Sequence, residues 1–181
     1  MEVEIKAKVD NLDEIKDKLK SLGASFDKVK KEEDFYYKIG NEIRNFEPGS
    51  FTLRVRDSDK GKFLTFKAFT DKYGVWDEHE VKIDDAQKMR TILEKSKFTL
   101  AYTITKERVS GKLDKFSFNL DRAKELGDYI EVELVSQEAE KAQAIIKDFL
   151  KSLGIKDNQL DRRGYPEIVA AKQGFYSKGQ K

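Results

Sequence analysis

The first nine residues alternate charged and apolar side chains without interruption, and this pattern constrains the fold more than any other stretch of the chain. Successive side chains of a β-strand point to opposite faces of the sheet. One face of the predicted strand therefore carries only charged residues: Glu2, Glu4, Lys6 and Lys8. The other face carries only aliphatic residues: Val3, Ile5, Ala7 and Val9. A strand of this kind is half-buried, with its charges facing either water or a polar interior.

Further stretches repeat this pattern of one aliphatic face and one charged face, and about eight strands are predicted in all. After residues 1–9 they are 35–38, 51–57, 62–69, 75–83, 98–109, 112–121 and 129–135. A turn at Asp59–Gly61 predicts a hairpin between two of them, and a turn at Gly111 predicts another. A polar loop is expected around Gly40 to Gly49.

Three segments place apolar residues at helical spacing on one side. Asp10 or Asn11 is expected to cap the first, which ends at Gly23, and Asp84 is expected to cap the second. Ser136 is expected to cap the third, which ends at Gly154, and a further helix is predicted from Pro166. Such narrow apolar stripes require an apolar sheet surface to pack on, so the sequence predicts an α+β fold.

Two sheet arrangements satisfy the pattern. An open sheet or sandwich would bury the aliphatic faces and leave the charged faces in water, whereas a closed barrel would turn the charged faces inward. The helices favour the barrel, since they would cover an aliphatic outer surface, and a closed sheet has no exposed edge.

Length and composition narrow the class of protein. A chain of 181 residues suits one domain, expected over residues 1–175, with a disordered tail at 176–181. Thirty-six Lys+Arg against 34 Asp+Glu argue against a nucleic-acid partner bound through bulk charge. Cysteine is absent, which excludes thiolate chemistry and disulfides. No apolar run suits a membrane span or a signal peptide, so a cytoplasmic protein is expected.

If the charged faces converge, they bring together two sets of side chains. The carboxylates are Glu2, Glu4, Glu78, Glu80, Asp121, Glu131 and Glu133. The cations are Lys6, Arg54, Arg56, Lys67, Lys106 and Arg108. Carboxylate clusters suit Mg²⁺ or Mn²⁺, and Arg and Lys suit phosphate oxygens. Together they indicate phosphoryl or nucleotidyl transfer on a polyphosphate.

At these residues the sequence resembles the CYTH family, which comprises class IV adenylyl cyclases, thiamine triphosphatases and related triphosphate tunnel metalloenzymes. The motifs follow in order: Glu2-x-Glu4-x-Lys6, Leu53-Arg54-Val55-Arg56, Leu64-Thr65-Phe66-Lys67, Glu78-x-Glu80, Lys106-x-Arg108, and Leu120-Asp121 leading to Glu131-x-Glu133. The resemblance implies an eight-stranded antiparallel closed β-barrel that forms a tunnel, with amphipathic helices packed on the outside.

The resemblance also implies roles for the site residues. The ligands of one or two Mg²⁺ or Mn²⁺ ions would be Glu2, Glu4, Asp121, Glu131 and Glu133. The triphosphate would be lined by Lys6, Arg54, Arg56, Lys67, Lys106 and Arg108. Glu78 and Glu80 are interpreted as orienting partners of these cations. Catalysis would depend on Glu2, Glu4, Lys6 and Glu133, and the roles of Arg162 and Arg163 stay open.

Two reactions fit such a site. Attack of the ATP 3′-hydroxyl on the α-phosphorus would give cyclic AMP and pyrophosphate, and the short chain with its immediate Glu-x-Glu-x-Lys start is most similar to that class IV cyclase branch. Attack of water on the terminal phosphorus would hydrolyse inorganic triphosphate, thiamine triphosphate or a nucleotide. A non-catalytic module that binds polyphosphate or nucleotides is the alternative from another class, and a homodimer could form through uncovered sheet surface.

Overall fold

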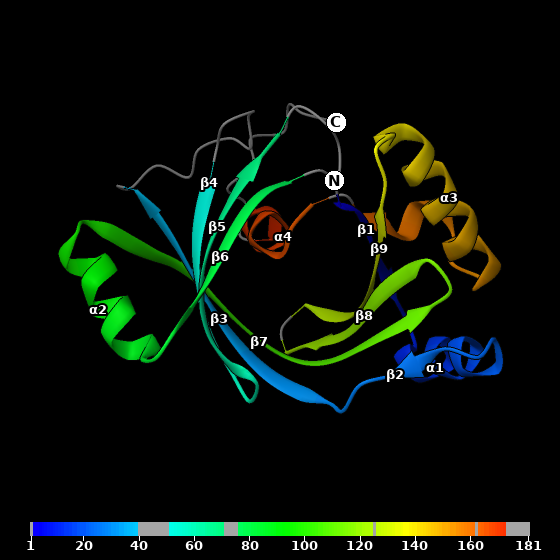
Figure 1. The fold of residues 1–181 in the computed structure, drawn as a ribbon, viewed down its shortest axis with the longest axis horizontal. Coiled ribbons are helices and arrows are strands. Elements are labelled where there is room, and N and C mark those ends of the chain that lie inside the picture. Colours follow the sequence, from blue (N-terminus) through cyan, green and yellow to red (C-terminus); the bar gives the residue numbers. More distant parts are fainter. Residues whose placement is uncertain (1, 40–50, 71–75, 125, 162, 173–181) are drawn as a thin grey trace. The chain divides into compact units, whose positions relative to one another are not determined.

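The computed structural model describes residues 2–39, 51–70, 76–124, 126–161 and 163–172 (Figure 1). These residues fall into two compact units. The first unit contains residues 2–31, 106–124 and 126–161, and the second contains residues 32–39, 51–70, 76–105 and 163–172. The predicted loop around Gly40–Gly49, the tail 176–181 and Arg162 lie outside the described residues.

The strands of the first unit are antiparallel, and its neighbouring strands β1 (Glu2–Val9) and β9 (Gly127–Val135) each carry a Glu-x-Glu pattern. The strand order is β10 (Leu160–Asp161), β1, β9, β8 (Phe116–Ala123) and β7 (Phe98–Leu113). The short strand β2 (Ser25–Phe26) pairs with β7. Residues 106–113 of β7 belong to this unit and residues 98–105 to the other.

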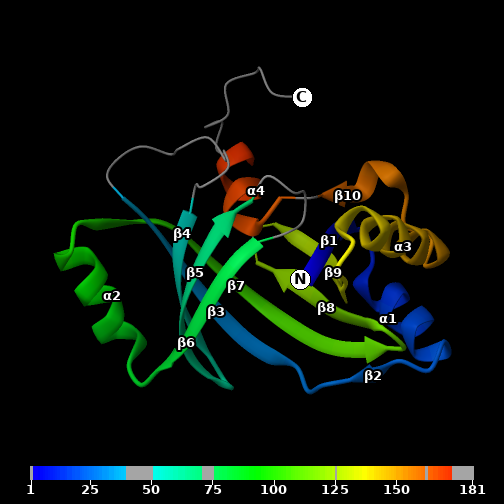
Figure 2. The same ribbon diagram turned by 45° about the horizontal axis from the view of Figure 1, so that its top comes forward.

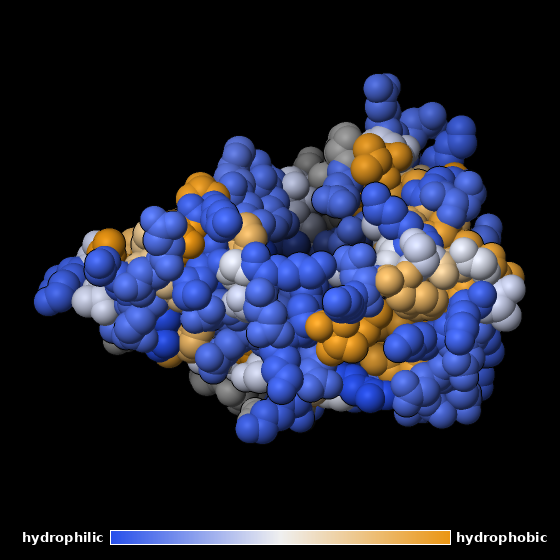
Figure 3. All heavy atoms as spheres, turned by 60° about the horizontal axis from the view of Figure 1, so that its bottom comes forward, coloured by the Kyte–Doolittle hydropathy of each residue, from blue (hydrophilic) through white to orange (hydrophobic). Residues whose placement is uncertain are grey.

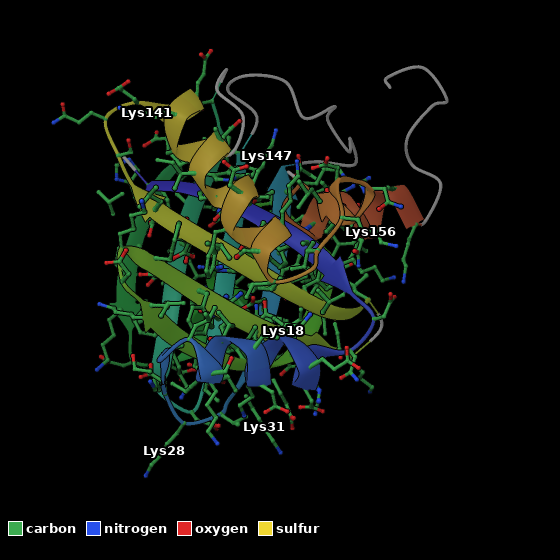
Figure 4. All side chains as sticks on the ribbon, turned by 90° about the vertical axis from the view of Figure 1, so that its right-hand side faces the viewer. Lys18, Lys28, Lys31, Lys141, Lys147 and Lys156 are labelled. Carbon is green, nitrogen blue, oxygen red and sulfur yellow. The ribbon has the colours of Figure 1, made fainter. Side chains whose placement is uncertain are left out.

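Helices α1 (Leu12–Ser21) and α3 (Ala139–Ser152) cover one face of this sheet, as Figure 4 shows. The core between them contains Val3 and Ile5 of β1, Ile130 and Val132 of β9, and Leu19 of α1, all almost fully buried. These are the aliphatic positions of the alternating strands, so burial of that face fixes the register. The charged face of β1 and β9 is therefore directed away from the helices.

The second unit contains antiparallel strands with one helix on their aliphatic side. Its strands run in the order β7, β3 (Lys30–Ile39), β4 (Phe51–Ser58), β5 (Gly61–Phe69) and β6 (Trp76–Ile83). Helix α2 (Ala86–Lys95) packs on β4 and β5 through Ala86 and Leu93, which meet Phe35, Tyr37 and Val55 (Figure 2). Helix α4 (Tyr165–Lys172) completes the unit.

The strand predictions are confirmed in number and differ in their bounds. Eight of the described strands have eight or more residues, and the other two have two residues each. The predicted strand 35–38 begins earlier, because β3 starts at Lys30. The predicted turn at Gly111 is wrong: β7 continues to Leu113, and the chain turns at Asp114, where φ is +52°. Gly111 is required for close approach, since a Cβ there would lie 2.4 Å from the Phe118 ring.

Two of the predicted helix caps are also corrected. Of the two predicted caps for α1, Asp10 and Asn11, the structure confirms Asn11, which accepts hydrogen bonds from the backbone of Asp13 and Glu14. Asp85, not Asp84, caps α2 through a bond from the Lys88 backbone. Ser136 does not cap α3, which begins at Ala139 with Glu138 at its N-cap position. The Ser136 hydroxyl instead accepts from the Glu138 backbone and shapes the turn before the helix.

Hydrophilic residues cover most of the face drawn in Figure 3, in keeping with a charged fraction of 39%. Within the described ranges, no helix has the length and hydropathy that crossing a membrane requires.

Candidate functional site

The pairing of β1 with β9 brings the two Glu-x-Glu motifs together in the first unit. Glu4 lies directly opposite Glu133, and Lys6 lies directly opposite Glu131. Directly opposed side chains of an antiparallel pair have Cβ atoms about 4.5–5.5 Å apart, so each charge acts on its partner. One pair thus joins two carboxylates and the other joins a carboxylate to an ammonium group.

Four charged side chains form a continuous buried network on this face. Lys6 Nζ donates to Glu131 Oε1 over 2.7 Å, and Arg108 Nη2 donates to Glu131 Oε2 over 3.0 Å. Arg108 also holds Asp121 through two bonds of 2.6 Å, from Nε and from Nη2. The two positive and two negative charges balance, and their mutual attraction offsets the free-energy cost of removing them from water.

The network holds Lys6 in its charged form. Burial alone would lower the pKa of the Lys6 ammonium, but the carboxylates of Glu131, Glu4 and Asp121 outweigh it. Its pKa therefore lies above the ordinary value. Lys6 stays cationic across the physiological pH range and can serve as a fixed positive charge toward an anion.

Glu133 has the opposite electrostatic surroundings. Burial raises the pKa of the Glu133 carboxyl to about 8, together with the nearby carboxylates of Glu131, Glu2 and Glu4. Asn119 Nδ2 donates to Glu133 Oε1 over 3.2 Å, and Ser110 Oγ donates to Asn119 Oδ1 over 2.8 Å. The second bond fixes which end of the Asn119 amide faces Glu133.

The donor set of this face suits a hard divalent cation. Several carboxylates repel one another here, and a cation would relieve that repulsion. Among the described residues, however, no three carboxylate or imidazole side chains already stand at the spacing of a metal site. Arg108 binds both oxygens of Asp121, and Lys6 and Arg108 bind one oxygen each of Glu131, so a metal ion at either carboxylate would share it with these cations. The oxygen donors of the glutamates of β1 and β9 and of Asp121 fit the chemistry of Mg²⁺ or Mn²⁺.

The second unit has its own charged face, where Arg54 is surrounded by acceptors. Arg54 Nη2 donates to Glu80 Oε2 over 3.1 Å and to Thr65 Oγ1 over 3.0 Å, and it lies 3.6 Å from Glu78 Oε1. Thr65 Oγ1 in turn donates to Glu80 Oε2 over 2.8 Å. Lys67 Nζ pairs with Glu78 Oε2 at 3.2 Å and lies 4.7 Å from the centre of the Trp76 ring. Glu78 and Glu80 therefore contact two of the predicted cations.

Arg56 has different partners on the same sheet. Its Nε and Nη2 donate to the two oxygens of Asp34 over 2.6 and 2.8 Å, and its Nη2 lies 3.2 Å from Glu32 Oε2. Asp34 stands directly opposite Arg56 in the β3–β4 pair. Burial and the Asp34 carboxylate raise the pKa of the neighbouring Tyr36 phenol to about 12, so Tyr36 remains neutral.

The predicted residues thus fall into two groups, each described within its own unit. The first unit contains Glu2, Glu4, Lys6, Lys106, Arg108, Asp121, Glu131 and Glu133. The second contains Arg54, Arg56, Lys67, Glu78 and Glu80. Glu2 is exposed, whereas Lys106 is buried on β7. Sequence reasoning missed the buried residues Glu32, Asp34 and Thr65 and the Asn119 amide. The available signals were that Thr65 shares a strand face with Lys67 and that Asn119 shares one with Asp121.

Comparison with known proteins agrees with this geometry. The family model described as the CYTH domain matches residues 1–165. The Methanocaldococcus jannaschii protein named "Putative adenylate cyclase MJ0240" is 34% identical over 174 residues, covering 93% of this chain and 98% of that protein. A conserved hypothetical protein from Pyrococcus furiosus has a similar structure, with a TM-score of 0.82, 28% identity, and coverage of 92% of this chain and 99% of that one. A Hippeastrum protein, described as a "putative adenylyl cyclase" with a dominant triphosphatase activity, shares the fold at a TM-score of 0.64 and 20% identity, over 96% of each chain. The chain therefore belongs to the CYTH family.

Proposed function

We propose that this protein is a metal-dependent enzyme that acts on a triphosphate substrate, with ATP converted to cyclic AMP and pyrophosphate as its leading reaction. The observation that carries the proposal is the buried network of Lys6, Glu131, Arg108 and Asp121 beside the opposed pair Glu4 and Glu133. A chain that needed only stability would gain little from so many buried charges, because apolar residues of similar volume are often at least as stabilising.

In this proposal the glutamates of β1 and β9 hold Mg²⁺ or Mn²⁺: Glu2, Glu4, Glu131 and Glu133, with Asp121 as a further candidate. Bound there, the ion would supply positive charge that neutralises phosphate oxygens. The chain's own cations bind the remaining oxygens, with arginines forking onto them and lysines acting as point charges. The family resemblance assigns this role to Lys6, Lys106 and Arg108 and also to Arg54, Arg56 and Lys67.

The cations are held in place before any substrate arrives. Lys6 and Arg108 share Glu131, and Lys67 and Arg54 share Glu78. Preorganised charges of this kind stabilise the negative charge that develops in a transition state, because the side chains need not reorient during the reaction. Orienting the triphosphate is thus the main task that these residues perform, as in other phosphoryl-transfer sites.

The fold-level part of the proposal is a tunnel closed by the eight long strands, formed by one domain over residues 1–175. Support comes from the family match over residues 1–165. A small triphosphate-containing molecule is the proposed partner.

Two reactions remain candidates, and each has a specific relative in its favour. The cyclase reaction is supported by the Methanocaldococcus jannaschii protein, whose name refers to adenylate cyclase and which matches nearly end to end. Triphosphate hydrolysis is supported by the Hippeastrum protein, described as having a dominant triphosphatase activity.

Product analysis tests the proposal directly. The purified protein is incubated with ATP and, separately, with inorganic triphosphate, each with Mg²⁺, with Mn²⁺ and with a chelator. Cyclic AMP with pyrophosphate would establish the cyclase reaction, and orthophosphate without cyclic AMP would establish the triphosphatase. No turnover of either substrate, with triphosphate still raising the melting temperature, would favour a binding module instead.

Single variants test the residue roles. Glu4→Gln and Glu133→Gln are each expected to abolish turnover while the fold is retained, since each removes one carboxyl group from the opposed pair. Glu138→Gln is a matched control, because Glu138 is an exposed glutamate that pairs loosely with Lys141 at 3.7 Å. Normal turnover in both Glu4→Gln and Glu133→Gln would exclude the metal assignment.

A further inference from the structure

Arg56 and Arg54 lie on the same face of β4. Arg56 is more exposed than the carboxylates that bind it, whereas Arg54 is less exposed than its own carboxylates. Around Arg56 the carboxylates lie beneath the cation: the Asp34 and Glu32 side chains are 0% and 1% exposed, against 12% for Arg56. Around Arg54 the carboxylates lie above it: the Glu78 and Glu80 side chains are 38% and 39% exposed, against 13% for Arg54. An incoming anion would therefore meet the guanidinium first at Arg56 and the carboxylates first at Arg54.

We propose that Asp34, supported by Glu32, is a positioning residue that fixes the Arg56 guanidinium for binding to a phosphate group of the substrate. The inference rests on the proposed function, which assigns Arg56 to the triphosphate. It concerns two residues of β3 that touch the substrate only through Arg56, so their role is positioning and not catalytic.

The geometry of the fork supports this role. Asp34 binds Arg56 at both Nε and Nη2, and two parallel bonds define the plane of a guanidinium as well as its position. Arginine otherwise loses considerable rotamer freedom when it binds a ligand. Fixing the side chain in advance removes that loss from the binding step, and a misplacement of about 1 Å can cost a hundredfold in rate.

The first unit contains an Arg–Asp pair of the same geometry, which indicates that the Arg56–Asp34 pair did not arise by chance. Asp121 stands directly opposite Arg108 on adjacent strands, as Asp34 stands opposite Arg56. In both pairs the aspartate is fully buried and forks onto Nε and Nη2. In each unit, a buried aspartate thus fixes one arginine that is predicted to bind phosphate.

A double-mutant cycle measures whether Asp34 acts through Arg56. The probe is inorganic triphosphate with Mg²⁺, and its affinity is measured by calorimetry for the wild type, Asp34→Asn, Arg56→Lys and the double variant. Asp34→Asn is expected to weaken binding by roughly tenfold, and this effect should vanish in the Arg56→Lys background, where no fork can form. The control Asp57→Asn removes a half-exposed carboxylate of β4, the strand that carries Arg56; this carboxylate pairs with Lys62 at 3.5 Å, and its loss should leave the affinity unchanged.

A second readout needs no ligand. The Nε–H proton of Arg56 should be protected and visible in nitrogen-edited NMR spectra of the wild type, and it should exchange rapidly in Asp34→Asn. Glu32→Gln, which leaves the fork intact, should weaken triphosphate binding less than Asp34→Asn and keep the Arg56 signal. It also supplies a test if Asp34→Asn does not fold, because a purely structural pair would leave triphosphate affinity unchanged in folded Glu32→Gln.

The outcomes separate this inference from the proposed function. Wild-type protein that binds no triphosphate would overturn the proposed function and the inference together. Wild-type protein that binds triphosphate, with unchanged affinity in folded Asp34→Asn or with effects of Asp34→Asn and Arg56→Lys that simply add, would overturn the positioning role alone.

Discussion

Asp121 lies directly across from Arg108 on the β7–β8 pair and binds its guanidinium through two hydrogen bonds of 2.6 Å. A second Arg–Asp pair of the same unit, Arg122 and Asp13, has the same 2.6 Å contact but is exposed, with half of the Arg122 side chain and 72% of the Asp13 side chain open to solvent. The two pairs therefore differ in burial and not in contact distance.

This contrast predicts different costs for the same substitution. Asp121→Ala should lower the free energy of unfolding by about 3–5 kcal/mol, because it leaves the Arg108 charge buried with one partner fewer. Asp13→Ala should cost less than about 1 kcal/mol, since water solvates both of its charges. Urea unfolding followed by circular dichroism measures both. Equal costs for the two variants would show that burial does not govern the Arg108 pair.

The raised pKa of Glu133 predicts a distinctive dependence of stability on pH. The Glu133 carboxyl has a pKa of about 8 in the folded protein and an ordinary value of 4.5 in the unfolded chain. Between these values the folded state keeps a proton that the unfolded state has released, so the free energy of unfolding should fall as pH rises through this window. Below 4.5 both states are protonated, and above 8 both are ionised, so the contribution is constant outside it.

Glu133→Gln isolates this contribution, because glutamine does not titrate. The melting temperature of the variant minus that of the wild type should increase between about pH 5 and pH 8 and then level off. Glu138→Gln, at the exposed N-cap position of α3, is the control, and its difference should change less over this range than that of Glu133→Gln. A flat difference for Glu133→Gln as well would mean that its carboxyl is ionised in the folded protein at ordinary pH.

Local alternation was enough to predict most of the strands, because burial of one face imposes a period of two on the sequence. It was not enough for β3, whose first residues, Lys30 to Asp34, are all charged and present no alternation. Glu32 and Asp34 were therefore not recognised as buried. Their burial depends on Arg56 across the strand pair, and that register is a tertiary property that no local window contains.

For the candidate site, too, features set by neighbouring residues could be predicted from the sequence, and features set by strand pairing could not. The residue types could be read from the sequence, and so could the shared face of Glu2, Glu4 and Lys6. The direct opposition of Glu4 and Glu133 could not, because it depends on the pairing of β1 with β9, two strands far apart in the sequence. Likewise, the sequence does not show that Arg108 binds both Asp121 and Glu131, because these residues lie on three different strands.

Helices α1 and α3 of the first unit are linked by one lysine, which Figure 4 labels. Lys18 Nζ of α1 donates to the backbone carbonyl of Leu153, at the C-cap of α3, over 2.7 Å. A cation at a helix C-terminus satisfies a carbonyl that lacks a partner within the helix and also interacts favourably with the helix dipole. Lys18→Met should therefore destabilise the protein by about 1 kcal/mol. Lys20→Met, at an exposed position of the same helix, should have little effect; equal effects would make the Leu153 contact irrelevant to stability.

Metal binding should be linked to the protonation of Glu133. A divalent cation among the glutamates of β1 and β9 must compete with the proton that Glu133 holds up to about pH 8. We therefore expect Mg²⁺ or Mn²⁺ to raise the melting temperature more at about pH 9 than at about pH 6. Glu4→Gln should remove most of this shift, because it deletes the carboxylate directly opposite Glu133, while Glu138→Gln should retain it. A metal-induced shift of the same size at both pH values, undiminished in Glu4→Gln, would place the cation away from this pair.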